Sequence, residues 1–108
     1  MNLREILVEA IERKASDLHI TVGVPIILRV NGKLQSLNET IILPSDSEQL
    51  IRQLTTDQQW QALNNKGELD FSYSLPGLQR FRVNTYRQRN SYAAALRLIN
   101  SRIPSFEE

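Results

Sequence analysis

Apolar and polar residues follow two different periods along this chain, and each change of period marks a predicted element. Over residues 2–14 apolar side chains recur every three or four positions, which is typical of an amphipathic helix. This apolar face consists of Leu3, Ile6, Leu7, Ala10 and Ile11. Residues 17–21 then alternate between apolar and polar side chains, which predicts a strand with one buried face.

A second strand is predicted over residues 25–31, where Ile26, Leu28 and Val30 alternate with Ile27, Arg29 and Asn31. The dipeptide Asn31-Gly32 that ends it is the strongest short hairpin signal in the chain. Residues 33–37 would return from this turn as a third strand.

Two helices are predicted in the middle of the chain. The first lies within residues 43–54, and Ser45 with Glu48 has the spacing of a capping box at its start. The second begins at Thr56, with Gln59 as the partner in its box, and ends at Gly67.

Strands return after Gly67. In residues 68–75 every second side chain is apolar, and these side chains (Leu69, Phe71, Tyr73 and Leu75) would face one way. Two more strands are predicted at residues 79–88 and 91–100. The order of helix, three strands, two helices and three strands predicts an α+β domain on a mainly antiparallel sheet of about six strands.

Composition narrows the class of protein without pointing to a partner. The chain has 108 residues, enough for one domain, and 13 Lys and Arg against 12 Asp and Glu give a net charge of +1. The absence of cysteine excludes disulfides and thiol chemistry. No apolar run approaches the ~20 residues that span a bilayer, so we expect a cytoplasmic protein.

The last two strands hold the main candidate for chemistry. A turn centred on Arg89 and Asn90 makes residues whose numbers sum to 179 face each other, so Phe81 meets Leu98 and Val83 meets Leu96 on a core face. On the other face Arg82 meets Arg97, an unfavourable pair of like charges. With small Ala93 and Ala95 beside them, and Arg80 on the same face, these guanidinium groups would form a fork for an anion.

A purely structural role is the alternative for this face. "LPG" at residues 75–77 suits a three-residue hairpin loop with Gly77 in the left-handed conformation, in a register that sets Asp70 beside Arg82. An ordinary ion pair between these two side chains would leave only a solvated surface. The pattern by itself leaves both interpretations open.

Other chemistry has little support. His19 is the single histidine, and although Asp17 shares its face, no nucleophile is placed with them, so we expect an ordinary outer-face side chain. One histidine and no cysteine argue against a transition-metal site. A nucleic-acid surface would use Arg80, Arg82, Tyr86, Arg87 and Arg89, but only one aromatic shares the Arg82 face, so we do not expect this partner.

Three segments together resemble the N-terminal domain of the PilT-type pilus-retraction ATPases, within the type II/IV secretion ATPase superfamily. They are "ASDLHITVGVPIILRVNGKL", "ELDFSYSLPGLQRFRVNTY" and the closing "RIPSFEE". The resemblance covers essentially the whole chain. It implies a PAS-like domain over residues 1–100, followed at 101–108 by the start of a linker to a RecA-like ATPase domain.

The resemblance implies that the complete protein is a homohexamer that hydrolyses ATP with Mg²⁺ to power pilus retraction and twitching motility. In secretion ATPases of this superfamily two arginines of the N-terminal domain reach the nucleotide's phosphates, and the resemblance implies that Arg82 in "RFRVN" and Arg97 in "ALRLI" hold these positions, with Arg80 as a possible auxiliary. The chain lacks a P-loop sequence, so we expect no ATP hydrolysis by it alone. The implied partners are the RecA-like domain, neighbouring subunits and the pilus machinery of the inner membrane, to which the cytoplasmic motor would be peripheral.

Two alternatives remain at this point. The chain could come from a pilus-assembly or type II secretion ATPase of the same superfamily, or it could be a free-standing PAS-like module that binds another anion or partner. Because the first predicted helix begins almost at Met1, without long preceding domains, we expect the retraction branch.

Overall fold

The computed structural model describes residues 1–88 and 90–99, so Arg89 of the predicted turn and the predicted linker start at 101–108 lie outside the described residues. Six antiparallel strands form one sheet in the order β3-β2-β1-β6-β5-β4. The helices are α1 (Leu3–Glu12), α2 (Pro44–Leu54) and α3 (Asp57–Lys66). The strands are β1 (Asp17–Ile20), β2 (Ile27–Val30), β3 (Lys33–Ser36), β4 (Glu68–Leu75), β5 (Gln79–Gln88) and β6 (Ser91–Ile99). The predicted α+β class and order of elements are confirmed.

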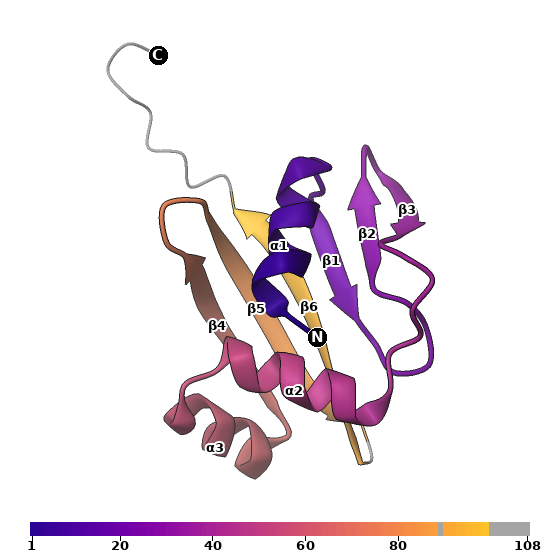
Figure 1. Cartoon of the computed structure of the whole chain (residues 1–108). Helices are drawn as coiled ribbons and strands as arrows, with labels where there is room; N and C mark the ends of the chain where they lie inside the picture. The colour runs from indigo at the N-terminus through magenta and orange to yellow at the C-terminus, as the bar shows by residue number, and fades with distance from the viewer. Residues whose placement is uncertain (89, 100–108) are drawn as a thin grey trace, which may run out of the picture.

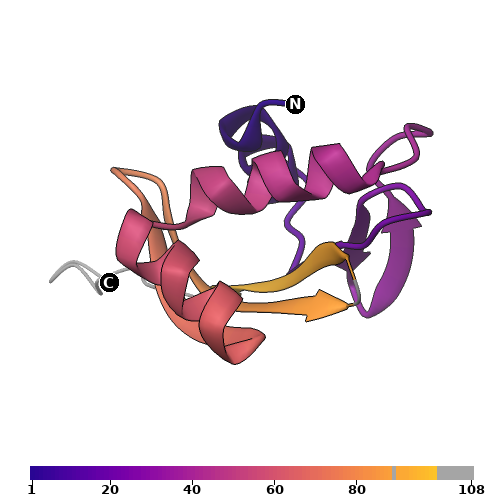
Figure 2. The ribbon, with the colours of Figure 1, turned by 90° about the horizontal axis from the view of Figure 1, so that it is seen from below.

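The helices leave one face of the sheet uncovered in the described part of the chain. Helices α1 and α2 lie across the same face, and α3 packs against β4 and β5 at the end of the sheet (Figures 1 and 2). The core fills the space between sheet and helices. From the sheet it takes Leu18, Ile20, Leu28, Phe81, Val83 and Leu96, and from the helices Leu3, Leu7, Leu50, Ile51 and Leu63, all almost fully buried.

The hairpin turn at Gly32 and the helix end at Gly67 both adopt the backbone that the sequence predicts. Asn31 and Gly32 have φ values of 53° and 78°, the left-handed pair that a two-residue hairpin between β2 and β3 requires. Gly67 ends α3 at φ 82° and donates its N–H to the carbonyl of Leu63 at 2.7 Å. These turns depend on local chemistry alone, which is why the sequence predicts them.

The start of α2 differs from the prediction, and the capping box of Ser45 with Glu48 is wrong. The helix begins at Pro44, whose fixed φ and missing N–H suit the first helical position. The side chain that folds back is consequently Asp46, which accepts a hydrogen bond from the N–H of Leu43 at 3.0 Å. Ser45 is exposed in the first turn.

The register of β4 against β5 also differs from the prediction. Gly77 is left-handed as expected, at φ 76°. The hairpin closes, however, on the pair Leu75 and Gln79, so Ser72 faces Arg82 while Asp70 faces Asn84. The predicted neighbours Asp70 and Arg82 are displaced by two residues, and no ion pair joins them in the described structure.

Within residues 1–88 and 90–99, no helix combines the length and apolar character needed to cross a lipid bilayer.

The two predicted helix caps can be compared by substitution. Thr56 accepts a hydrogen bond from the Gln59 N–H at 3.1 Å, and Gln59 returns one from its side chain, so Thr56→Ala should lower the free energy of unfolding by about 1 kcal/mol. Ser45→Ala is the matched control and should change it by less than about 0.5 kcal/mol. Urea denaturation measures both. An equal loss in the two variants would contradict the cap assignment.

Candidate functional site

A shallow groove of about 620 Å³ lies on the uncovered face of the sheet. Its polar lining comes from four strands: Asp17 and His19 of β1, Asp70 and Ser72 of β4, Arg82 and Asn84 of β5, and Arg97 of β6. Strand alternation explains this grouping, because the same strands direct their apolar side chains to the core on the other face.

Arg82 and Arg97 face each other directly across β5 and β6, as predicted. The pairs Phe81 with Leu98 and Val83 with Leu96 are also those expected. Both arginines are exposed, and among the described residues no hydrogen bond or ion pair joins Arg82 to another side chain. Two cationic groups therefore stand side by side at the groove.

The two arginines have different surroundings. On the side of Arg97 away from Arg82 lies β1, where Asp17 is the directly paired residue. The Nε of Arg97 donates to Oδ2 of Asp17 at 3.3 Å, and the Ser16 hydroxyl donates to Oδ1 of the same carboxylate at 2.7 Å. Arg97 is thus held from one side, while its guanidinium remains largely in solvent.

The pKa of Asp17 reflects this environment. Partial burial by itself raises the pKa of the carboxyl, but the hydrogen bonds from Ser16 and Arg97, with the Coulombic effects of Arg97 and His19, more than offset it. The net result is a pKa below the ordinary value of 3.8. Asp17 is therefore ionised at neutral pH.

The floor of the groove is low because a small side chain occupies its centre. Ala95 on β6 lies between His19 on β1 and Asn84 on β5. Asn84 donates from Nδ2 to Asp70 Oδ1 at 2.6 Å, so this second carboxylate is engaged by an amide and not by Arg82. His19 is half-buried at the wall, on the outer face as predicted.

Arg80 and Arg87, also singled out in the sequence, do not line the groove, and Arg89 lies outside the described residues. Arg80 shares the open face but lies beyond the groove's lining, in the row that pairs with Ile99. Arg87 points to the opposite face, with its guanidinium carbon 5.8 Å from the centre of the Tyr92 ring. Among the arginines that the structure describes, only Arg82 and Arg97 line the groove.

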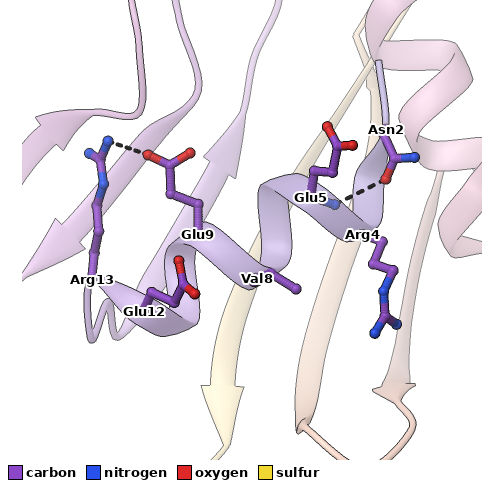
Figure 3. Close-up of a pocket in the computed structure, with 7 residues that line it drawn as sticks. All are labelled: Asn2, Arg4, Glu5, Val8, Glu9, Glu12 and Arg13. Carbon is purple, nitrogen blue, oxygen red and sulfur yellow. Dashed lines mark hydrogen bonds and ion pairs between the residues drawn. The ribbon is translucent and has the colours of Figure 1, made fainter.

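A second depression, of about 640 Å³, lies along the outward face of α1 (Figure 3). Its lining comes from one helix and the residues at its two ends, which cannot surround a ligand. Arg13 forms an ion pair with Glu9 and donates to the carbonyl of Leu37 at 2.9 Å. We regard this surface as an ordinary solvated helix face and the groove as the candidate site.

Sequence reasoning did not find the contact between Asp17 and Arg97. Each residue lies on the polar face of its strand, but β1 and β6 are 70 residues apart and no turn sets their register. The alternation of each strand was the only available signal, and it says which face a residue occupies without saying which residue is opposite.

The structure is an α+β domain whose open sheet face presents paired arginines beside a groove. No family model matches the chain. The type IV pilus retraction ATPase PilT and the type IV pilus ATPase PilU, both of Pseudomonas aeruginosa, are each 33% identical to it over all 108 residues. The chain covers 31% of the first protein and 28% of the second, so it spans about a third of the length of these relatives.

A solved structure agrees with the sequence relatives. The crystal structure of the pilus retraction motor PilT with bound ADP matches 99% of this chain with a TM-score of 0.87 and 38% identity, and the match covers 32% of that chain. The chain is therefore a domain of the PilT type and corresponds to the N-terminal domain of these pilus ATPases.

The lowered pKa of Asp17 predicts a pH-dependent contribution to stability. A carboxyl with a depressed folded-state pKa stabilises the fold above its ordinary pKa of 3.8, and this contribution is lost as the pH falls through the range below it. Because the Arg97 side chain is 73% exposed, the contribution at pH 7 should be well below about 1 kcal/mol. Urea denaturation of the wild type and Asp17→Asn between pH 7 and pH 3 measures it. A difference between the two proteins that grows on acidification would contradict this sign.

Proposed function

We propose that this domain belongs to an ATPase that powers retraction of type IV pili, and that Arg82 and Arg97 contact the phosphates of ATP held by a RecA-like domain. The observation that carries the proposal is the pair of arginines that face each other across β5 and β6 on an open groove. The similar PilT motor, whose crystal structure contains ADP, supports a nucleotide as the anion.

The chemistry of the pair suits a triphosphate. A guanidinium group presents a planar fork of N–H donors that matches phosphate oxygens and stays charged at every physiological pH. Two such groups held side by side repel each other in the absence of a ligand. A polyanion between them removes that repulsion, so binding gains from both hydrogen bonds and charge neutralisation.

The same arrangement would couple nucleotide state to domain position. The sequence contains no P-loop, so in this proposal a RecA-like domain of the complete protein supplies it, with Mg²⁺ accompanying ATP there. Arginines on one domain and phosphate-binding loops on another draw the two domains together while the terminal phosphate is present. Loss of that phosphate removes contacts between the arginines and the nucleotide and allows the domains to separate.

The complete protein would work as a homohexamer in the cytoplasm, beside the inner-membrane part of the pilus machinery. In such a ring, closure of this domain on a bound nucleotide would move the surfaces that meet the neighbouring subunit. The role proposed for the domain is therefore regulatory and structural, and the bond-breaking chemistry belongs to the RecA-like domain.

Substitution of the two arginines in the complete ATPase tests the proposal. Arg82→Ala and Arg97→Ala should each lower ATP turnover by about 10- to 100-fold, because each removes a charged contact to the phosphates. Arg80→Ala should have a smaller effect, since Arg80 lies outside the groove's lining. Steady-state ATPase assays measure the turnover, and thermal unfolding reports whether each variant keeps its fold.

Arg4→Ala is the matched control, because Arg4 is an exposed arginine on the outward face of α1, away from the groove. It should retain wild-type turnover. Wild-type turnover in both groove variants would exclude the phosphate role.

A further inference from the structure

One row of paired residues crosses all six strands at the level of the two arginines. From β3 to β4 the row reads Leu34, Arg29, Asp17, Arg97, Arg82 and Ser72. Three arginines thus share a row with a single carboxylate. That carboxylate lies between two of them.

Asp17 is engaged with only one of its two arginine neighbours. Arg29, on the β2 side, donates from Nη1 to the Gly32 carbonyl at 3.2 Å within its own hairpin. Arg97, on the β6 side, donates from Nε to Asp17 at 3.3 Å. The carboxylate is therefore directed toward the groove pair.

The carboxylate is the better fixed of the two partners. The Asp17 side chain is 17% exposed, against 73% for Arg97, and the Ser16 hydroxyl holds its other oxygen. The lowered pKa of Asp17 keeps it charged at neutral pH. An anchored anion next to a solvated cation sets the orientation of the cation.

The contact uses one of the five N–H donors of the guanidinium. Within residues 1–88 and 90–99 the two Nη groups of Arg97 have no hydrogen-bond partner. A bond through Nε is compatible with simultaneous donation of the Nη groups to a second anion, because the donors lie on different edges of the planar group.

We propose that Asp17 is a positioning residue that holds Arg97 through Nε, so that the Nη groups of Arg97 act together with Arg82 on one phosphate chain. This inference rests on the proposed function and adds to it the residue that orders the arginine pair. Arg82 is oriented by no such contact in the described structure, so the pair consists of one fixed and one adjustable donor group.

The sign of the effect separates positioning from charge alone. By Coulomb's law, removal of a negative charge beside two arginines strengthens the binding of any anion. Loss of a positioning contact weakens it, because the side-chain freedom of Arg97 must then be lost on binding. Asp17→Asn therefore gives opposite results under the two mechanisms.

The experiment is an NMR titration of the 108-residue chain with inorganic tripolyphosphate, followed at the arginine Nε–Hε signals. In the wild type we expect the signals of Arg82 and Arg97 to shift together with one dissociation constant. Asp17→Asn should raise that constant by roughly threefold and speed solvent exchange of the Arg97 Hε proton. An unchanged or lower constant in Asp17→Asn would overturn the inference.

Two further variants guard against trivial explanations. Ser16→Ala keeps the carboxylate but removes its hydrogen bond, and it should weaken binding in the same direction by less than Asp17→Asn does. Asp17→Asn in an Arg97→Ala background should cause no additional weakening, because the residue that Asp17 orients is gone. A loss that persists in that background would show that Asp17 acts by another route and would refute the inference.

Glu9→Gln is the matched charge control. Glu9 is also paired with an arginine, Arg13, but on α1 outside the groove, so this variant has the same change in net charge. It should not weaken binding. Absence of any tripolyphosphate shift at Arg82 and Arg97 in the wild type would count against the proposed function itself, whereas retained or tighter binding in Asp17→Asn counts against Asp17 alone.

Discussion

The register of β5 against β6 is the constraint on which both the core and the groove depend. Along each strand the side chains alternate between faces, so a slip of β5 by one residue against β6 would carry Arg82 into the core and Phe81 out of it. Burial of an unpaired guanidinium group would cost far more free energy than any contact formed after the slip could supply. The apolar side chains of the core therefore place both arginines on the open face of the sheet.

The repulsion between the two arginines is a small unfavourable contribution to stability, whereas burial of the apolar side chains on the other face is a large favourable one. Like charges on directly opposed positions of a sheet are unfavourable by up to about 1 kcal/mol. Burial of one large apolar side chain contributes about 1.5–3 kcal/mol, so the core keeps the register despite the repulsion. Asp17 reduces the repulsion from the outer side of the pair, and Asn84 keeps the other groove carboxylate, Asp70, engaged.

The sequence predicted the parts of the structure that neighbouring residues determine. The hairpin at Asn31, the cap at Thr56, the stop at Gly67 and the pairing of Arg82 with Arg97 all follow from short segments, and all are confirmed. The start of α2 was missed because two competing signals, Pro44 and Ser45, stand side by side. Without a second constraint, the sequence had no means to rank them.

The errors of register have a common cause. The pairing of β4 with β5 was displaced by two residues because a loop with a left-handed glycine can be closed by more than one pair of residues, and only packing chooses among them. The pairing of β1 with β6 joins segments with both middle helices between them, so no turn sets it. The arginine pair of the groove could therefore be predicted, because both residues belong to one hairpin. The positions of Asp17 and His19 beside that pair could not be predicted, because they depend on the pairing of β1 with β6.

The uncovered face of the sheet has a consequence for how such a domain can change over generations. The polar lining of the groove and the apolar core lie on opposite sides of the same strands, so exchange of a polar groove side chain leaves the packing beneath the helices intact. Mutation can then change the chemistry of this surface with little effect on folding. The fold of such a domain can therefore persist in evolution while the side chains on the uncovered face of its sheet change.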